Sequence, residues 1–132
     1  MAIYIDRQLQ ITVSKNANLT DPVMQRGSTV TKIKEQTHLA EVVSGSIVVP
    51  APSTNLQLSI SPGITTGRAF YLESDQNLTV KFGGTEDDRA LTLKVPETSK
   101  LATMYLEIEF DSVYVTLGGT TDANIYYAAI GA

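Results

Sequence analysis

The 132-residue sequence contains no cysteine, no tryptophan and a single histidine. Without cysteine there is neither a disulfide nor a thiolate nucleophile, and one histidine is a poor supply of ligands for a zinc site. A serine-type catalytic triad would have to use His38, but no GxSxG motif accompanies it. We therefore predict that the protein is not an enzyme and has no cofactor and no metal centre, with His38 as a structural residue.

Charged residues are also scarce, at 18% of the chain, against the roughly 25% of an average soluble domain. The net charge is −4, and no cluster of lysine and arginine forms the basic patch that binds nucleic acids or anionic lipids. Residues 1–66 carry 5 basic and 4 acidic side chains (+1), whereas residues 67–132 carry 5 basic and 10 acidic ones (−5). We expect no nucleic-acid partner and an acidic second half.

Long apolar runs are missing as well. The first ten residues, MAIYIDRQLQ, reach Asp6 and Arg7 before the apolar segment of an export signal could form. No run elsewhere approaches the about 20 apolar residues of a membrane-spanning helix. We expect neither an export signal nor a contact with a membrane.

Apolar and polar residues, by contrast, alternate along much of the chain with a period of two, which is typical of strands with one buried face. The clearest cases are residues 9–13, 56–60, 78–82 and 91–95. Further strands are predicted over residues 30–36, 40–49, 69–73, 104–110, 113–117 and 125–130. The pattern predicts an all-β protein over residues 1–132, a single-domain antiparallel β-sandwich or jelly-roll-like barrel of about eight to ten strands.

The segment 104–117 allows a stricter prediction. A two-residue turn at positions 111–112 would pair Phe110 with Val113 and place every apolar residue of both strands on one face. Tyr105 and Tyr114 then fall on the outer face, where rigid rings with a polar tip suit a binding surface. A bulge, or an edge strand that changes sheets at this turn, is the alternative.

The longest stretch without a strand pattern is polar and covers residues 14–28. Within it Thr20, Asp21 and Pro22 suit the first turn of a helix, and a loop fits equally well. We predict a surface loop, or an arm that reaches a neighbouring molecule.

Two GGT sequences begin at Gly83 and Gly118, each between two apolar runs. A phosphate-binding loop would be followed by a helix, whereas a strand pattern follows here, so we predict two β-turns. The acidic run EDD at 86–88 lacks the alternating oxygen ligands of a calcium loop and is interpreted as a solvated turn. If a cation binds, Asp122 in the second turn is the partner to test.

The last predicted strand, residues 125–130, is apolar on both faces, and residues 40–49 share this character. A soluble monomer seldom leaves such a strand open, so it is either a central strand of the sandwich or part of a subunit interface. We predict a symmetric homo-oligomer, with a trimer favoured. The candidate interface residues are Ile125, Tyr126, Tyr127, Ile130, Tyr105 and Tyr114.

The run FYLESD at 70–75, the run NLTVKFGG at 77–84 and the late strand pair with its Ala-, Ile- and Gly-rich tail resemble small β-sandwich proteins of tailed bacteriophage virions. The nearest resemblance, over residues 68–132, is to capsid decoration or cement proteins. Such proteins typically form trimers or other symmetric clusters over capsomer junctions and hold the shell together without chemistry or cofactor.

This resemblance implies a non-enzymatic structural protein of the virion, assembled in the host cytoplasm. Its implied partners are its own copies and the major capsid protein or other virion proteins. The alternative is a carbohydrate-binding or adhesion module, including a phage tail or fibre component, with Tyr105 and Tyr114 as the stacking platform.

Overall fold

The computed structural model describes residues 7–18, 20–30, 41–83 and 89–132. Within these ranges every regular element is a strand and every pairing between strands is antiparallel. The all-β prediction is therefore confirmed. The strands are β1 (Arg7–Ser14), β2 (Pro22–Val30), β3 (Glu41–Val49), β4 (Ser53–Gln57), β5 (Gly67–Ser74), β6 (Leu78–Phe82), β7 (Ala90–Leu93), β8 (Ala102–Leu106), β9 (Val113–Leu117) and β10 (Ala123–Gly131).

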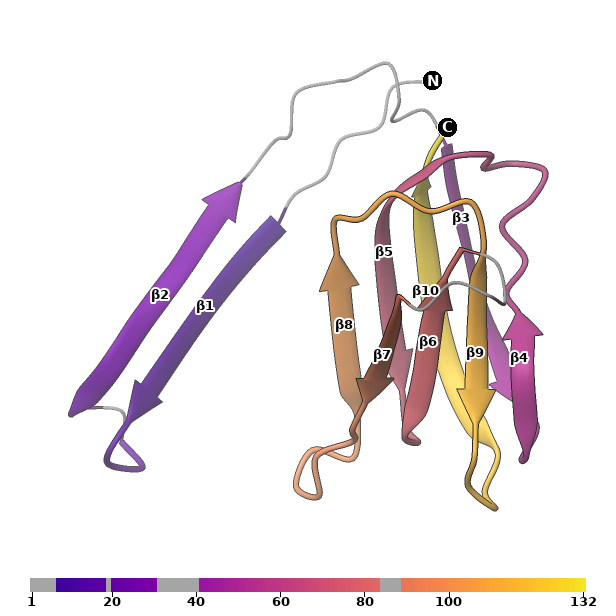
Figure 1. Cartoon of the computed structure of the whole chain (residues 1–132). Coiled ribbons are helices and arrows are strands. Elements are labelled where there is room, and N and C mark those ends of the chain that lie inside the picture. The colour runs from indigo at the N-terminus through magenta and orange to yellow at the C-terminus, as the bar shows by residue number, and fades with distance from the viewer. Residues whose placement is uncertain (1–6, 19, 31–40, 84–88) are drawn as a thin grey trace.

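Eight of these strands form two four-stranded sheets that pack face to face (Figure 1). Sheet I has the order β3-β10-β5-β8, and sheet II has the order β4-β9-β6-β7. No strand hydrogen-bonds from one of these sheets to the other, so the described part of the molecule is a β-sandwich and not a closed barrel. Of the two architectures that the sequence predicted, the sandwich is the one found.

The chain from β3 to β10 is wound as one long antiparallel ribbon. β6 pairs with β7 at its tip, and β5 with β8, β4 with β9 and β3 with β10 follow outward. Successive pairs of the ribbon alternate between the two sheets, which is the winding of a jelly roll. It brings β10 into the middle of sheet I, hydrogen-bonded to β3 on one side and β5 on the other.

An aromatic cluster lies at the centre of the core between the sheets. Phe70 of β5 is fully buried and contacts Phe82 and Phe110 edge to face, with ring centroids 5.5 and 5.8 Å apart. Tyr127 of β10 stacks on Phe70 at 6.4 Å. The cluster contains all three phenylalanines of the chain. They come from both sheets and from the crossing between them, so the cluster packs the two layers together.

One glycine is required where the chain crosses from sheet I to sheet II. Phe110 forms an isolated antiparallel bridge with Gly67, and its ring lies over that glycine. A Cβ atom at position 67 would lie 2.2 Å from the Phe110 ring, a distance that cannot be accommodated without movement. Only glycine at position 67 leaves room for the ring.

The predicted hairpin over residues 104–117 is wrong. β8 pairs with β5 in sheet I, and β9 pairs with β4 and β6 in sheet II. The chain changes sheets between them, as the stated alternative proposed. The alternation of apolar and polar residues does not distinguish a hairpin within one sheet from a crossing between two sheets. Strands of both sheets turn their apolar residues towards the same core, so both arrangements give the same pattern.

Residues 14–28 match the predicted loop only between the strands, at residues 15–18 and 20–21. Residues 22–30 form strand β2, which pairs with β1 along its whole length. β2 lacks clear alternation because its apolar residues, Val23, Met24 and Val30, do not recur at every second position. Of the strand predicted over residues 30–36, residues 31–36 lie outside the described part of the chain.

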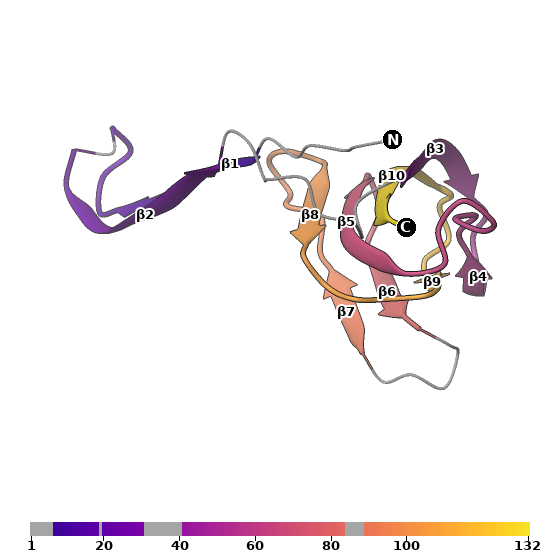
Figure 2. The same ribbon diagram turned by 90° about the horizontal axis from the view of Figure 1, so that it is seen from above.

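The β1–β2 hairpin, called the arm below, pairs with no strand of either sheet. In both views it stands apart from the sandwich, beyond the edge formed by β7 and β8 (Figures 1 and 2). That the arm contacts a neighbouring molecule stays a prediction.

The two GGT sequences have different roles. The first joins β6 to its neighbour β7 and so reverses the chain, and Gly83 adopts φ 96°, a conformation that favours glycine. The second joins β9 of sheet II to β10 of sheet I, so it is an arch between layers and not the turn of a hairpin. The acidic run at 86–88 lies outside the described residues.

Candidate interaction surfaces

The outer face of sheet I gathers three of the six tyrosines. Tyr71 of β5 lies directly opposite Tyr105 of β8, and the ring of Tyr126 of β10 meets that of Tyr71 edge to face at 6.2 Å. Because alternate residues of a strand share a face, the register defines the whole surface. We call it the tyrosine face; its residues are Val42, Ser44, Ser46, Val48, Ala69, Tyr71, Glu73, Thr103, Tyr105, Asn124, Tyr126, Ala128 and Ile130.

Two carboxylates hold two of the three tyrosine hydroxyls of this face. Tyr71 Oη donates to Glu73 Oε1 at 2.7 Å, and Tyr105 Oη donates to Glu107 Oε1 at 3.2 Å. The hydrogen bond to Glu73, with burial and the negative charge of that carboxylate, raises the pKa of Tyr71 to about 12. The rings are thereby fixed in place with an acidic rim.

The tyrosine face carries exposed apolar residues beyond its aromatic centre. On β3 Val42 and Val48 are 45% and 56% exposed, with Ser44 and Ser46 between them, and Tyr126 is 38% exposed. Ala128 and Ile130 of β10 lie between β3 and β5 and are partly covered. A flat surface of exposed aromatic and β-branched residues marks a candidate site for protein contact.

The outer face of sheet II has another character. Tyr114 of β9 lies there, opposite Lys81 of β6 and Gln57 of β4, with Thr79 opposite Thr116 in the next positions. Tyr105 and Tyr114 are both on outer faces, as predicted, but on opposite sides of the sandwich. The proposed stacking platform of these two tyrosines is therefore wrong.

The predicted interface residues of the last strand separate into two groups. Ile125 and Tyr127 face the core, where Tyr127 is 4% exposed and its hydroxyl donates to the carbonyl oxygen of Ser59 at 2.9 Å. Tyr126 and Ile130 belong to the tyrosine face. β10 is thus a central strand, and only Tyr126 and Ile130 of these four are placed to meet a partner.

Tyr71 was missed by the sequence analysis. The signal was present, because in the run FYLESD the residues Phe70 and Leu72 face the core and Tyr71 must point the other way. Alternation alone does not predict that Tyr71 lies beside Tyr105 and Tyr126, because these two residues belong to strands that are distant in the sequence.

The arm is the second candidate surface. Its register places Val13 opposite Met24, Ile11 opposite Arg26 and Leu9 opposite Ser28. Gln8, Met24 and Gln25 are exposed to solvent, Met24 to 41%.

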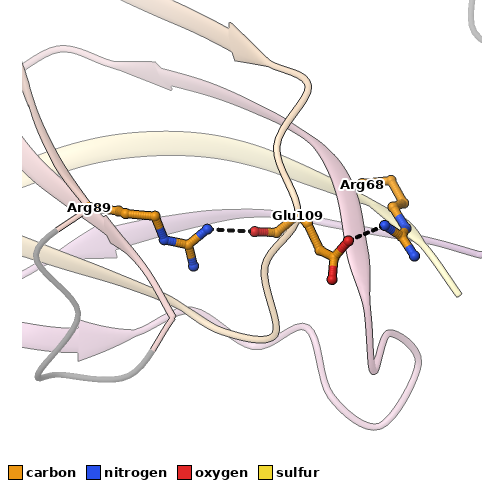
Figure 3. Close-up of polar contacts among 3 residues, drawn as sticks. All are labelled: Arg68, Arg89 and Glu109. Carbon is orange, nitrogen blue, oxygen red and sulfur yellow. Dashed lines mark hydrogen bonds and ion pairs between the residues drawn. The ribbon is translucent and has the colours of Figure 1, made fainter.

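A polar cleft of about 530 Å³ lies near the sheet crossing and is lined by Arg89, Glu109 and Asp111 among others. Figure 3 shows two of these residues held by hydrogen bonds: the Glu109 carboxylate accepts from Arg68, and the Glu109 carbonyl oxygen accepts from Arg89 Nη1 at 2.8 Å. Arg89 also donates to the carbonyl oxygen of Phe82 at 3.2 Å. These contacts fasten the chain segments around the crossing.

Two further carboxylates, Asp122 and Asp75, support turns of the chain. Asp122 accepts from the backbone N–H of Ala51 at 2.8 Å. Asp75 accepts from both the backbone and the side-chain amide of Asn124 at 2.8 Å, which fixes the start of β10 against the end of β5. Among the described residues no three side chains of His, Cys, Asp or Glu gather as a metal site would require, and His38 lies outside them.

No family model, curated protein or solved structure matches the chain. Within the described ranges there is no helix of the length and hydropathy needed to cross a bilayer. The tyrosine face and the arm are the two candidate interaction surfaces of the described chain.

Proposed function

We propose that the protein is a non-enzymatic structural protein of a bacteriophage virion, of the capsid decoration or cement type. In this role it forms a symmetric homo-oligomer, with a trimer favoured, and binds the major capsid protein on the outside of the head. The observation that carries the proposal is the arm, whose two strands pair, among the described strands, only with each other and stand apart from the sandwich. A projecting hairpin is suited to joining one molecule to another.

Two further features support an assembly role. The tyrosine face presents exposed Val42, Val48 and Tyr126 on a flat sheet, which is a surface for contact and not an enclosed pocket. Jelly-roll sandwiches also occur in viral capsid domains and in lectins, although a shared fold is an analogy and does not specify function.

The experiment is sedimentation of the purified protein with empty heads of the phage that encodes it. The proposal predicts saturable binding at a fixed number of copies per capsomer, and heads that resist heat or loss of divalent cations better with the protein than without it. A protein that stays in the supernatant at every concentration, while control decoration proteins bind their own heads, would contradict the capsid role.

A second candidate function is carbohydrate binding, and the observation that favours it is the cluster of Tyr71, Tyr105 and Tyr126 beside Glu73 and Glu107. Aromatic rings can stack on sugar faces while carboxylates accept hydrogen bonds from hydroxyls. A glycan array distinguishes this function: binding that is lost in Tyr126→Ala and kept in Tyr114→Ala would favour it over the capsid role.

A further inference from the structure

The edge strands of the sandwich differ in how well they are protected from pairing with another molecule. Short length, a bulge or a charge on an edge strand discourages the addition of a further strand. β7 and β8 have only four and five residues, and β4 has a register shift, with Asn55 at φ 50°. β3 has nine residues, with no charge after Glu41, no proline and no register shift against β10. Of the described edges, β3 is the one suited to accept another strand.

β3 is also open to solvent. Among the described strands it pairs with β10 alone, at the end of sheet I away from β8, and the arm stands beyond the opposite side of the sandwich (Figures 1 and 2). Val42 and Val48 are 45% and 56% exposed, and Ser44 and Ser46 between them are exposed as well. A strand added at this edge would cover part of both valines.

The sequence of β3 indicates what the added strand is. Residues 42–48 read VVSGSIV, which is a palindrome apart from the exchange of valine and isoleucine at positions 43 and 47. Antiparallel pairing of two such strands about Gly45 sets Val42 opposite Val48, Val43 opposite Ile47 and Ser44 opposite Ser46 of the second copy. Each apolar residue then meets an apolar residue and each hydroxyl meets a hydroxyl, so the strand is complementary to itself.

We propose that β3 pairs with β3 of a second copy, antiparallel and centred on Gly45, so that the two four-stranded sheets I join into one continuous sheet across a two-fold axis. Main-chain hydrogen bonds along the joined edges hold the copies together, and the side-chain pattern sets the register. The proposal goes beyond the proposed function, because a two-fold contact closes as a dimer, whereas a trimer is closed by a different contact.

Gly45 is explained by this contact and not by the core of its own chain. A Cβ atom at position 45 would lie 3.5 Å from the Tyr127 side chain, which is an ordinary van der Waals distance. A glycine inside a strand marks a bulge, a bend or the close approach of another backbone, and the register of β3 against β10 is unbroken. On the two-fold axis the two glycines lie opposite each other, and the two backbones can approach closely.

The size of the contact sets its strength. Seven residue pairs at about 3.4 Å each, across a sheet about 10 Å thick, give a contact of roughly 240 Å² on each copy. This is smaller than the roughly 800 Å² per partner of a standard stable interface. We therefore expect association that depends on protein concentration and not a permanent dimer.

Complementary charges test the contact and its register. Val48→Lys and Val42→Glu each place a charge opposite a valine twice in the two-fold pair, so each alone should raise the dissociation constant about tenfold or more in sedimentation equilibrium. In a mixture of the two variants, the introduced ammonium and carboxylate groups lie opposite each other, and the remaining Val42 meets the remaining Val48. Association in the mixture should therefore return to within about threefold of the wild type.

Thr92→Lys is the matched control, because it adds the same charge at an exposed position of another edge strand, β7, and should associate like the wild type. A mixture that associates no better than either variant alone, or a wild type that stays monomeric up to millimolar concentration, would overturn the proposal. A wild-type trimer that none of these variants alters would refute the β3 contact and leave the proposed function standing.

Cross-linking tests the same register without a change of charge, and the chain has no native cysteine to interfere. Ser44→Cys and Ser46→Cys are prepared separately, mixed and oxidised. Directly opposite residues have Cα atoms about 4.5–5.5 Å apart, which a disulfide can bridge, whereas residues offset by two positions lie too far apart. The proposal predicts a disulfide-linked heterodimer in the mixture and little product from either variant alone.

Thr103→Cys is the control acceptor, because it lies exposed on β8 at the other edge of sheet I. It should give no heterodimer with Ser44→Cys. Equal yields with Ser46→Cys and Thr103→Cys, or no product with either, would refute the pairing of β3 with its copy, whatever the outcome of the capsid experiment.

Discussion

Replacing Tyr127 by phenylalanine removes one hydroxyl group and leaves the aromatic ring in place. The hydroxyl donates to the carbonyl oxygen of Ser59 at 2.9 Å, and the ring stacks on Phe70. A hydrogen bond of this kind contributes a net of about 1 kcal/mol. For a chain of this size that corresponds to a fall of about 4 °C in the melting temperature of Tyr127→Phe.

Tyr127→Asp should have a far larger effect. Loss of a buried aromatic ring costs about 3–5 kcal/mol, and burial of a carboxylate adds several more unless it becomes protonated. Together these approach the roughly 5–15 kcal/mol that stabilise a typical domain. We therefore expect Tyr127→Asp to unfold the sandwich. If Tyr127 lay at a subunit interface instead, the same substitution would dissociate the assembly and leave each copy folded.

The assay is thermal and urea unfolding followed by circular dichroism, with Tyr126 as the matched control. Tyr126 is the next residue on the same strand but faces outward, so Tyr126→Phe should change the free energy of unfolding by less than about 0.5 kcal/mol. Tyr126→Asp should stay folded. A folded Tyr127→Asp variant with the wild-type transition would refute the placement of β10 in the core.

Two further predictions concern single sites. Gly67→Ala should lower the free energy of unfolding by about 1–3 kcal/mol through overpacking against Phe110, whereas Gly118→Ala, where a Cβ atom meets nothing within 4 Å, should be nearly neutral in urea titrations. Tyr71 should ionise near pH 12 by ultraviolet difference absorbance and nearer 10 in Glu73→Ala. Because its pKa is raised in the folded state, Tyr71 contributes stability that is fully present below pH 10 and is lost as the pH rises towards 12.

The sequence predicted most strands of the sandwich because burial of one face imposes a period of two, as the alternating burial in β6, β9 and β10 shows. It did not predict which strands pair. Phe110 and Val113 both face the core, but Phe110 lies in the crossing between the sheets and Val113 lies in β9 of sheet II. Only contacts between residues far apart in the sequence distinguish this arrangement from a hairpin. β2 was missed because its strand conformation depends on its partner β1 and not on its own pattern.

The candidate surfaces were predicted only in part, again because the sequence pattern does not show which strands pair. The outward positions of Tyr105 and Tyr114 follow from alternation alone, but their separation onto two sheets follows from the winding of the ribbon. The two-sided apolar character of the last strand was real, since Tyr127 enters the core and Tyr126 the tyrosine face. Sequence alone did not decide which side was available to a partner.

Amide hydrogen exchange in the arm of the unmodified protein tests most directly whether the arm joins one copy to another in the proposed homo-oligomer. A free two-stranded hairpin opens readily and exchanges fast, whereas a hairpin packed on a second copy is protected. The account predicts slow exchange in β1 and β2 that becomes slower as protein concentration rises, while exchange in β10 stays slow throughout. Fast exchange in the arm at every concentration, or protection that does not depend on concentration, would contradict it.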